Sequence, residues 1–195
     1  MDVGSADGLL LDTVGADVAI GTDISIEYCR KMKEKGIEVI NCVAERLSFA
    51  DQIFDVITCM EVLEHVLFPN EVVNEIYRVL KNRGYVLFSI PYRERLVAHS
   101  YRKYEFAHLR TFDEVFIRTL SDLFTIKSVE YYAFRVILIR FYNAFITRFL
   151  NVVWKIQSFR SFFVNYHKHI RFLNITRYIK PTYVLILTVK EPRHT

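Results

Sequence analysis

The sequence predicts an α/β fold in which helices cover a mostly parallel sheet. Short apolar runs alternate with amphipathic stretches through the first half of the chain, and glycines and helix-capping residues separate them. No internal repeat or linker rich in Pro, Gly or Ser interrupts this pattern, so the chain is expected to form a single domain, residues 1–195. With 195 residues, 52% of them hydrophobic, it is long enough for one sizeable core. This composition excludes a disordered chain, a disulfide-stapled miniprotein and a low-complexity fibre.

The strands are expected where apolar runs end at turn residues. Residues 1–4 have the pattern of a buried strand that enters a glycine turn, and because strands usually have about five or six residues, we expect this first strand to be truncated. The other expected strands are 16–22, 37–43, 54–59, 85–90, 124–130 and 182–189.

Helices are expected where a side-chain oxygen can accept the free N–H groups of a first turn and where glycine can end the last turn. The first helix is expected between a cap at Ser25 and a stop at Gly36. The second is expected over 71–80, with Asn70 as its cap and an exit turn at 82–84. A capping box at 111–114 is expected to open a third helix that runs to about Ser121.

The loop DVGSADG, at positions 2–8, lies between the first strand and a helix. Glycines there let the backbone approach a ligand, and the helix N-terminus offers free N–H groups. Asp23 ends the next strand, where an acid can accept both hydroxyls of a ribose. Taken alone, Asp23 is equally well explained as an acid stabilised by the following helix N-terminus. Together, the loop and Asp23 indicate a nucleoside ligand at the carboxyl edge of a parallel sheet.

The loop does not match the dinucleotide fingerprint, because it has Gly4 and Gly8 with Ala6 between them and lacks the third glycine of a nicotinamide-linked oxidoreductase. Four ordered blocks instead resemble class I S-adenosylmethionine-dependent methyltransferases of the methyltransferase type 11 group. The HLRTF stretch at 108–112 matches a frequent later element of that family. The four blocks are DVGSADG at 2–8, AERLSF at 44–49, FDVITCMEVLEHV at 54–66 and RVLKNRG at 78–84.

This resemblance implies a Rossmann-like methyltransferase fold: a mostly parallel seven-stranded sheet with an antiparallel last strand and, here, a truncated first strand. It also implies S-adenosyl-L-methionine as the cofactor. Val43 stands where the family usually has an acid for the adenine amine, and Ala6 replaces a glycine. The implied cofactor-binding residues are Asp2, Gly4, Ser5, Ala6 and Gly8 on the methionine side, Asp23 at the ribose, Ile24, Ala44 and Glu45 at the adenine, and Cys59, Met60 and Glu61 beside the sulfonium.

Methyl transfer demands little of side chains, because a sulfonium is already an activated donor and the enzyme mainly aligns the attack. A base is needed only if the acceptor must lose a proton. His65 and His108 are the candidate catalytic residues, with Tyr92 less favoured. A packed or capping histidine is the competing interpretation of each imidazole.

On a helix, Glu61, Glu64 and His65 would share one face, so two carboxylates and an imidazole could converge. This spacing resembles a motif that binds a divalent metal in quinone-pathway O-methyltransferases and in RNA 3′-end methyltransferases. Metal-free relatives carry the same letters, and no fourth ligand is evident. We therefore expect no metal, with these three residues as the ligands if one binds.

The two halves of the chain carry opposite charge. Residues 1–100 hold 10 Lys and Arg against 16 Asp and Glu, a net charge of −6, whereas residues 101–195 hold 16 against 6, a net charge of +10. No acid lies between Glu130 and Glu191. The second half is thus the expected surface for an anionic partner, with a solvated basic face as the equally favoured alternative.

Residues 135–180 are expected to form a basic, aromatic, helical insert before the last strand. Within 140–158, polar and basic positions fall on one helical face and apolar ones on the other. Packing on the sheet, or on a second subunit in a homodimer, is the first interpretation. A helix at a membrane surface, serving a lipid-like acceptor, is the second. Nucleic acid is disfavoured because the positive charges are spread and no base-reading motif is present.

The sequence therefore predicts methyl transfer from S-adenosylmethionine to an unidentified small-molecule or lipid-like acceptor. The alternative is a non-catalytic, truncated methyltransferase-fold domain that binds a nucleoside or a protein partner. Three cysteines without CxxC spacing, Cys29, Cys42 and Cys59, are typical of reduced thiols. We expect a cytoplasmic protein, peripheral to the membrane if 135–180 contacts lipid.

Overall fold

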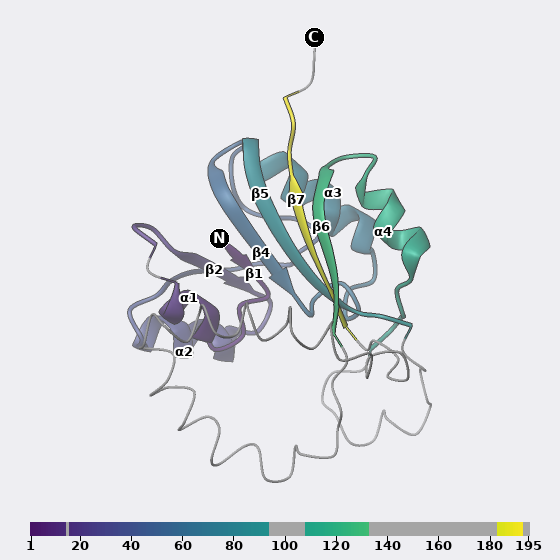
Figure 1. The fold of residues 1–195 in the computed structure, drawn as a ribbon. Coiled ribbons are helices and arrows are strands. Elements are labelled where there is room, and N and C mark those ends of the chain that lie inside the picture. The colour runs from purple at the N-terminus through teal and green to yellow at the C-terminus, as the bar shows by residue number, and fades with distance from the viewer. Residues whose placement is uncertain (15, 94–107, 133–182, 193–195) are drawn as a thin grey trace, which may run out of the picture. The chain divides into compact units, whose positions relative to one another are not determined.

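The computed structural model describes residues 1–14, 16–93, 108–132 and 183–192 (Figure 1). All of these residues except Tyr132 belong to one compact unit, which comprises Met1–Tyr131 and Tyr183–Thr195. A second unit is assigned to Tyr132–Thr182. The expected insert at 135–180 lies outside the described residues, so its helical character stays a prediction, as does the single-domain organisation.

One seven-stranded sheet has the strand order β3-β2-β1-β4-β5-β7-β6 (Figure 1). Neighbours from β3 through β5 are parallel, and β7 runs antiparallel to β5. This confirms the mostly parallel sheet and the antiparallel last strand. The strands are β1 (Asp2–Val3), β2 (Ile20–Asp23), β3 (Glu38–Asn41), β4 (Phe54–Met60), β5 (Leu80–Pro91), β6 (Thr125–Tyr132) and β7 (Tyr183–Val189).

The strand order reverses beside β1, because β2 and β3 lie on one side of it and β4 and β5 on the other. In open α/β sheets a ligand binds outside the carboxyl ends of the strands at such a switch point. The loop after β1 and the segment after β4 therefore flank the expected crevice.

Four helices are described: α1 (Leu9–Thr13), α2 (Ile26–Glu34), α3 (Pro69–Val79) and α4 (Glu114–Leu120). The expected cap of α2 is confirmed, because the Ser25 side chain accepts a hydrogen bond from the backbone N–H of Tyr28 at 3.3 Å. Within the described ranges, each helix is too short or too polar to span a lipid bilayer.

Two helix starts differ from the prediction. The helix α3 begins at Pro69, one residue before the expected cap Asn70, because proline has a preset φ and no N–H to leave unbonded in a first turn. The helix α4 is capped by Asp113 and not by Thr111: the Asp113 carboxylate accepts a hydrogen bond from the backbone N–H of Val115 at 2.9 Å. Asp113 competes successfully because an ionised oxygen accepts more strongly than a hydroxyl.

The turn expected at 82–84 is wrong, because these residues lie inside β5, which begins directly after α3. Phe54 pairs with Leu80 and Val56 with Tyr85, so the extra residues of β5 form a bulge opposite β4. Burial of Leu80 holds the start of the strand, and Arg83 takes a positive φ of 65° in the bulge.

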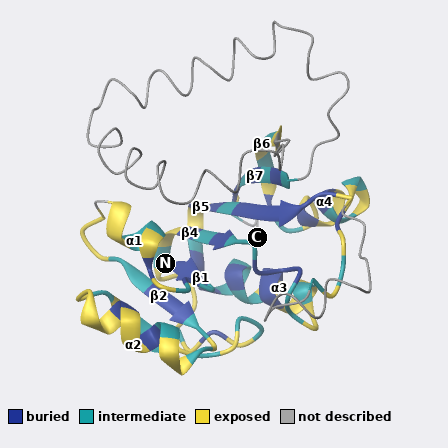
Figure 2. Ribbon diagram, turned by 90° about the horizontal axis from the view of Figure 1, so that it is seen from below, coloured by how far each residue is buried: buried dark blue, intermediate teal, exposed yellow. Residues whose placement is uncertain are grey.

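The main core lies between the central strands and the helices α3 and α4. Figure 2 shows buried residues along β4, β5 and α3, whereas the outward surfaces of α1 and α2 are exposed. The core residues are Val3, Ile57, Cys59, Val72, Ile76, Val86, Phe88, Ile90, Ile117, Leu120, Val184 and Ile186, with others at their edges.

Candidate cofactor site at the carboxyl edge of the sheet

The loop after β1 winds through left-handed backbone at three positions: φ is 68° at Gly4, 47° at Ala6 and 78° at Gly8. A Cβ on Gly4 would lie 2.5 Å from Cγ2 of Val62, which follows β4. The loop can therefore cross the end of β4 closely only with glycine at position 4. Ala6, the predicted departure from the family pattern, sits in a conformation that glycine adopts more easily.

Asp23 joins this loop to the end of β2. Its Oδ2 accepts a hydrogen bond from the backbone N–H of Ala6 at 2.9 Å, and its Oδ1 accepts one from Ser25 at 2.8 Å. Each carboxylate oxygen retains a further lone pair. The structure thus brings together the loop and the acid, which the sequence analysis had combined into one expected nucleoside site.

Two of the expected cofactor residues, Asp2 and Ser5, form hydrogen bonds within the protein. The Ser5 hydroxyl donates to the carbonyl of Asp2 at 2.8 Å and accepts from the N–H of Thr22 at 3.2 Å. The Asp2 carboxylate is buried and accepts a hydrogen bond from Oγ1 of Thr58 at 2.6 Å. Burial raises the pKa of Asp2, more than its hydrogen bond with Thr58 lowers it. These side chains stabilise the junction of β1, β2 and β4.

The residues expected at the adenine lie at the ends of β2 and β3. Ile24 is 69% exposed, which leaves an apolar surface beside the loop. Ala44 and Glu45 are half-buried, and Val43 is exposed.

Past the end of β4, Glu61 takes a positive φ of 54°. Its backbone N–H donates to the carbonyl of Ser89 at 3.0 Å, and the Ser89 hydroxyl donates to the Glu61 carboxylate. The neighbouring Cys59 is fully buried in the core, and burial raises the pKa of its thiol well above the ordinary value. The Cys59 side chain is therefore a packing residue, whereas Met60 and Glu61 are half-buried at the strand end. The sequence offered no signal for the partner Ser89.

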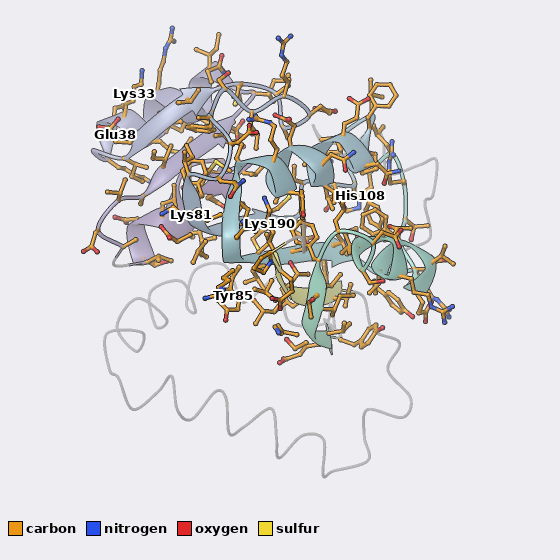
Figure 3. The ribbon with its side chains drawn as sticks, turned by 90° about the horizontal axis from the view of Figure 1, so that it is seen from above. Lys33, Glu38, Lys81, Tyr85, His108 and Lys190 are labelled. Carbon is orange, nitrogen blue, oxygen red and sulfur yellow. The ribbon has the colours of Figure 1, made fainter. Side chains whose placement is uncertain are left out.

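Glu64, His65 and His108 form a cluster in the fold. Nε2 of each histidine lies 4.0 Å from Oε1 of Glu64, and the imidazole ring centroids are 4.8 Å apart. Of the three residues, His108 is labelled in Figure 3. The Glu64 side chain is fully buried. The backbone carbonyl of Glu64 accepts a hydrogen bond from the N–H of Leu109 at 2.8 Å, which holds the 108–110 segment beside Glu64.

One potential ligand atom from each cluster residue lies within 4.8 Å of the others, so the three side chains could hold a divalent cation. The expected helical face is wrong, because residues 61–65 lie in the turn region between β4 and α3. The grouping also differs from the expected set: His108 is a member, and the Glu61 carboxylate is hydrogen-bonded to Ser89 instead. His108 is 43 positions from His65, so helical spacing alone had no means of finding it.

Tyr92 follows β5, and its hydroxyl donates to the Glu114 carboxylate, which also forms an ion pair with Arg93 at 2.6 Å. Burial, followed by the bond with Glu114, raises the pKa of Tyr92 to about 12. A phenol with this pKa stays protonated near neutral pH, which argues against Tyr92 as a general base.

Residues 1–88, less than half of the chain, match the model of a family described as a methyltransferase domain. The predicted resemblance to class I methyltransferases is thereby confirmed over these residues. A ubiquinone biosynthesis O-methyltransferase of Klebsiella pneumoniae is 37% identical over 98 residues, which cover 46% of this chain and 40% of the relative. The chain spans less than half of the length of the first curated relatives that it matches.

Two solved structures share the fold over nearly the whole chain. A chain of the complex between the Haloferax volcanii Trm112 methyltransferase activator and a methyltransferase has a TM-score of 0.66 at 20% identity, covering 100% of this chain and 82% of that one. The [4+2]-cyclase SpnF has a TM-score of 0.65 at 18% identity, covering 98% and 75%. At these identities the likeness concerns the fold.

Proposed function

We propose that the protein binds S-adenosyl-L-methionine at the carboxyl ends of β1, β2 and β4 and transfers its methyl group to a small-molecule or lipid-like acceptor. The hydrogen bond from Ala6 to Asp23 carries this proposal, because it joins a left-handed, glycine-containing loop to an acid suited to ribose hydroxyls. The bond lies beside the switch point of the sheet. The family match over residues 1–88 supports both the enzyme class and the cofactor.

The residues present fit this cofactor. Glycine lets this loop pack closely on its neighbours, because a Cβ would lie 2.5 Å from Val62 at position 4 and 2.6 Å from Ile37 at position 8. A glycine-containing loop of this kind would leave backbone accessible to a methionine moiety. Asp23 retains acceptor capacity for the ribose hydroxyls, and the exposed side chain of Ile24 offers an apolar contact for the adenine. The bound cofactor supplies an activated methyl group, so the protein mainly has to orient the acceptor and exclude water.

If the acceptor must lose a proton, His65 and His108 are the candidate bases. Both imidazoles are half-buried, and Nε2 of each lies 4.0 Å from Oε1 of Glu64. Changing His65 or His108 to Gln is expected to lower kcat by about 100-fold if that residue is the base. Equal activity of both variants and the unchanged protein contradicts the assignment.

A hydroxyl on a lipid-like molecule is the first acceptor class to test. The name of the Klebsiella relative, an O-methyltransferase of ubiquinone biosynthesis, supports this choice. The direct assay follows formation of S-adenosylhomocysteine with an alkylated phenol as acceptor, and compares it with a water-soluble amine.

The same cluster supports a second role. Two imidazoles and a carboxylate within 4.8 Å suit a divalent cation that would orient a hydroxyl acceptor. Chelation with EDTA followed by return of Mg²⁺, Mn²⁺ or Zn²⁺ distinguishes the two roles: loss and recovery of activity supports the metal, whereas full activity in EDTA supports a metal-free base.

The alternative proposal is a non-catalytic domain that binds a nucleoside or a protein partner. The fold by itself does not decide between the two, because one fold can host unrelated functions.

Calorimetric titration of S-adenosylhomocysteine into the whole chain, with NADH as the comparison, tests the proposal. We expect micromolar binding of the former alone, and loss of that binding in Asp23→Ala. Asp12→Ala is the matched control, because Asp12 is an exposed acid of α1 and its bond to the loop, from its N–H to the carbonyl of Gly8 at 3.0 Å, is made by the backbone and survives the change. Binding without turnover of any acceptor favours the non-catalytic alternative. Absence of binding by folded protein overturns the cofactor proposal.

A further inference from the structure

The guanidinium of Arg78, in the last turn of α3, binds the segment that follows β3. Its Nη2 donates to the carbonyl of Leu47 at 2.9 Å, and its Nη1 donates to the carbonyl of Phe49 at 2.7 Å. Nη1 also donates to Oδ1 of Asp51 at 2.7 Å. One side chain therefore contacts three points along residues 44–51, which we call the adenine-side loop.

Glu75 completes this contact from one turn earlier on α3. Both of its carboxylate oxygens accept from Arg78, each at 2.8 Å, and Oε2 also accepts the backbone N–H of Leu47 at 2.9 Å. The Arg78 guanidinium holds the pKa of Glu75 below its usual range. The two side chains are largely shielded from solvent, with 31% and 20% exposed, so these charge-assisted bonds are screened less than exposed pairs are.

The adenine-side loop begins with Ala44 and Glu45, two of the expected adenine contacts. Val43, just before it, has no carboxylate for the adenine amine. Recognition of the adenine by this segment then depends on where the loop places its backbone and the Glu45 side chain. Arg78, Glu75 and the buried side chain of Leu47 hold the loop at residues 47–51, directly after Ala44 and Glu45.

We propose that Arg78 is a positioning residue for the adenine end of the cofactor: it holds the adenine-side loop in its binding conformation without contacting the cofactor. This inference rests on the proposed cofactor site. Because a bound conformation that is only partly populated weakens apparent affinity in proportion, loosening the loop raises Kd and KM and leaves kcat at saturating cofactor unchanged.

Arg78→Met tests the inference, with Lys81→Met as the matched control. Lys81, labelled in Figure 3, is also a cation bonded to a carboxylate at 2.8 Å, but its partner is Asp55 of β4 and not the adenine-side loop. We expect Kd for S-adenosylhomocysteine to rise about tenfold in Arg78→Met, as for a binding conformation populated at about one tenth. In Lys81→Met, Kd stays within about twofold of the unchanged protein.

Two readouts separate positioning from loss of the fold. The inosine analogue of S-adenosylhomocysteine has a carbonyl in place of the 6-amine and a proton on N1, which reverses the donor and acceptor at this edge of the purine. Arg78→Met should therefore reduce the preference for adenosine over inosine. Arg78→Lys cannot form the two-pronged bond to Glu75 and should recover only part of that preference. In ligand-free protein, hydrogen exchange at the Leu47 amide should accelerate in Arg78→Met, while exchange in β4 and β5 stays as before.

The outcomes are distinguishable. Absence of binding by the unchanged protein overturns the cofactor site and this inference with it. Binding by the unchanged protein, with the same Kd and the same purine preference in folded Arg78→Met, overturns the inference alone. Faster exchange throughout β4 and β5 shows global destabilisation and also contradicts a local positioning role.

Discussion

The carboxylate of Asp23 accepts the backbone N–H of Ala6 at 2.9 Å across 17 positions of sequence. A second bond, from Ser25 at 2.8 Å, ties the same carboxylate to the start of α2. One side chain thereby couples the loop after β1, the end of β2 and the first turn of the next helix. The geometry of the candidate ribose site therefore exists before any ligand arrives.

Replacing Asp23 tests this coupling independently of the cofactor. Asp23→Ala removes both acceptors, and we expect the free energy of unfolding to fall by about 1–3 kcal/mol, as for two lost bonds to a charged group that is half-buried. Asp23→Asn keeps one carbonyl oxygen and should lose less. Urea unfolding measures both, and equal stability of all three proteins contradicts the coupling.

Gly4→Ala is expected to destabilise the loop for two reasons: positive φ costs about 1–2 kcal/mol for a residue with a Cβ, and the new Cβ would lie 2.5 Å from Val62. Gly36→Ala is the matched control, because Gly36 also has a positive φ, of 76°, but has nothing within 4 Å of its Cβ position. The excess loss of stability in Gly4→Ala measures the contact with Val62. Thermal unfolding that is the same for both variants rules out a close approach there.

Asp2→Asn is expected to change how stability depends on pH. Burial raises the native pKa of Asp2, so the native state binds the proton more tightly than the unfolded chain. The contribution of Asp2 to stability is therefore present at acidic pH and is lost as pH rises through the native pKa, above the ordinary carboxylate value. Asp2→Asn removes this decline and keeps an oxygen for Thr58.

Glu75→Gln is expected to change the pH dependence of stability in the opposite direction, because the pKa of Glu75 is lowered, chiefly by the bond with Arg78. Its stabilisation is present above the ordinary carboxylate pKa and is lost as pH falls through the native value. Denaturant unfolding of both variants between pH 3 and 8 measures how the free energy of unfolding changes with pH in each. Parallel curves for Asp2→Asn and the unchanged protein contradict the burial argument.

Lys190→Met is expected to destabilise the junction between α3 and β5. The buried Lys190 ammonium donates to the carbonyls of Tyr77 and Leu80 at 2.8 and 2.9 Å, at the helix C-terminus where a cation is favourable (Figure 3). We expect a loss of about 2–3 kcal/mol in the free energy of unfolding. Lys127→Met, which removes an exposed pair with Glu191, should cost less than about 1 kcal/mol. Equal losses of stability in Lys190→Met and Lys127→Met contradict the argument that the burial of Lys190 strengthens its contribution.

Local sequence was sufficient for features that depend on neighbouring residues. The Ser25 cap and the positive φ of Gly4, Gly8 and Gly36 follow from side-chain and backbone chemistry within one turn. The prediction failed at Asn70, Thr111 and 82–84, where several residues compete for one local role. A proline at the first helical position, an ionised cap and a bulge paired to β4 decided those cases.

The sequence by itself determined the alternation of strands and helices, the glycine-containing loop and Asp23 as the acid at the end of β2, because hydrophobic periodicity and turn chemistry are local. Only the tertiary structure decided that His108 joins Glu64 and His65, that Ser89 binds Glu61 and that Arg78 holds the adenine-side loop. These partners come from segments brought together by strand order and core packing. Their contacts form only when burial of the β4–β5 core offsets the entropy of closing the intervening chain.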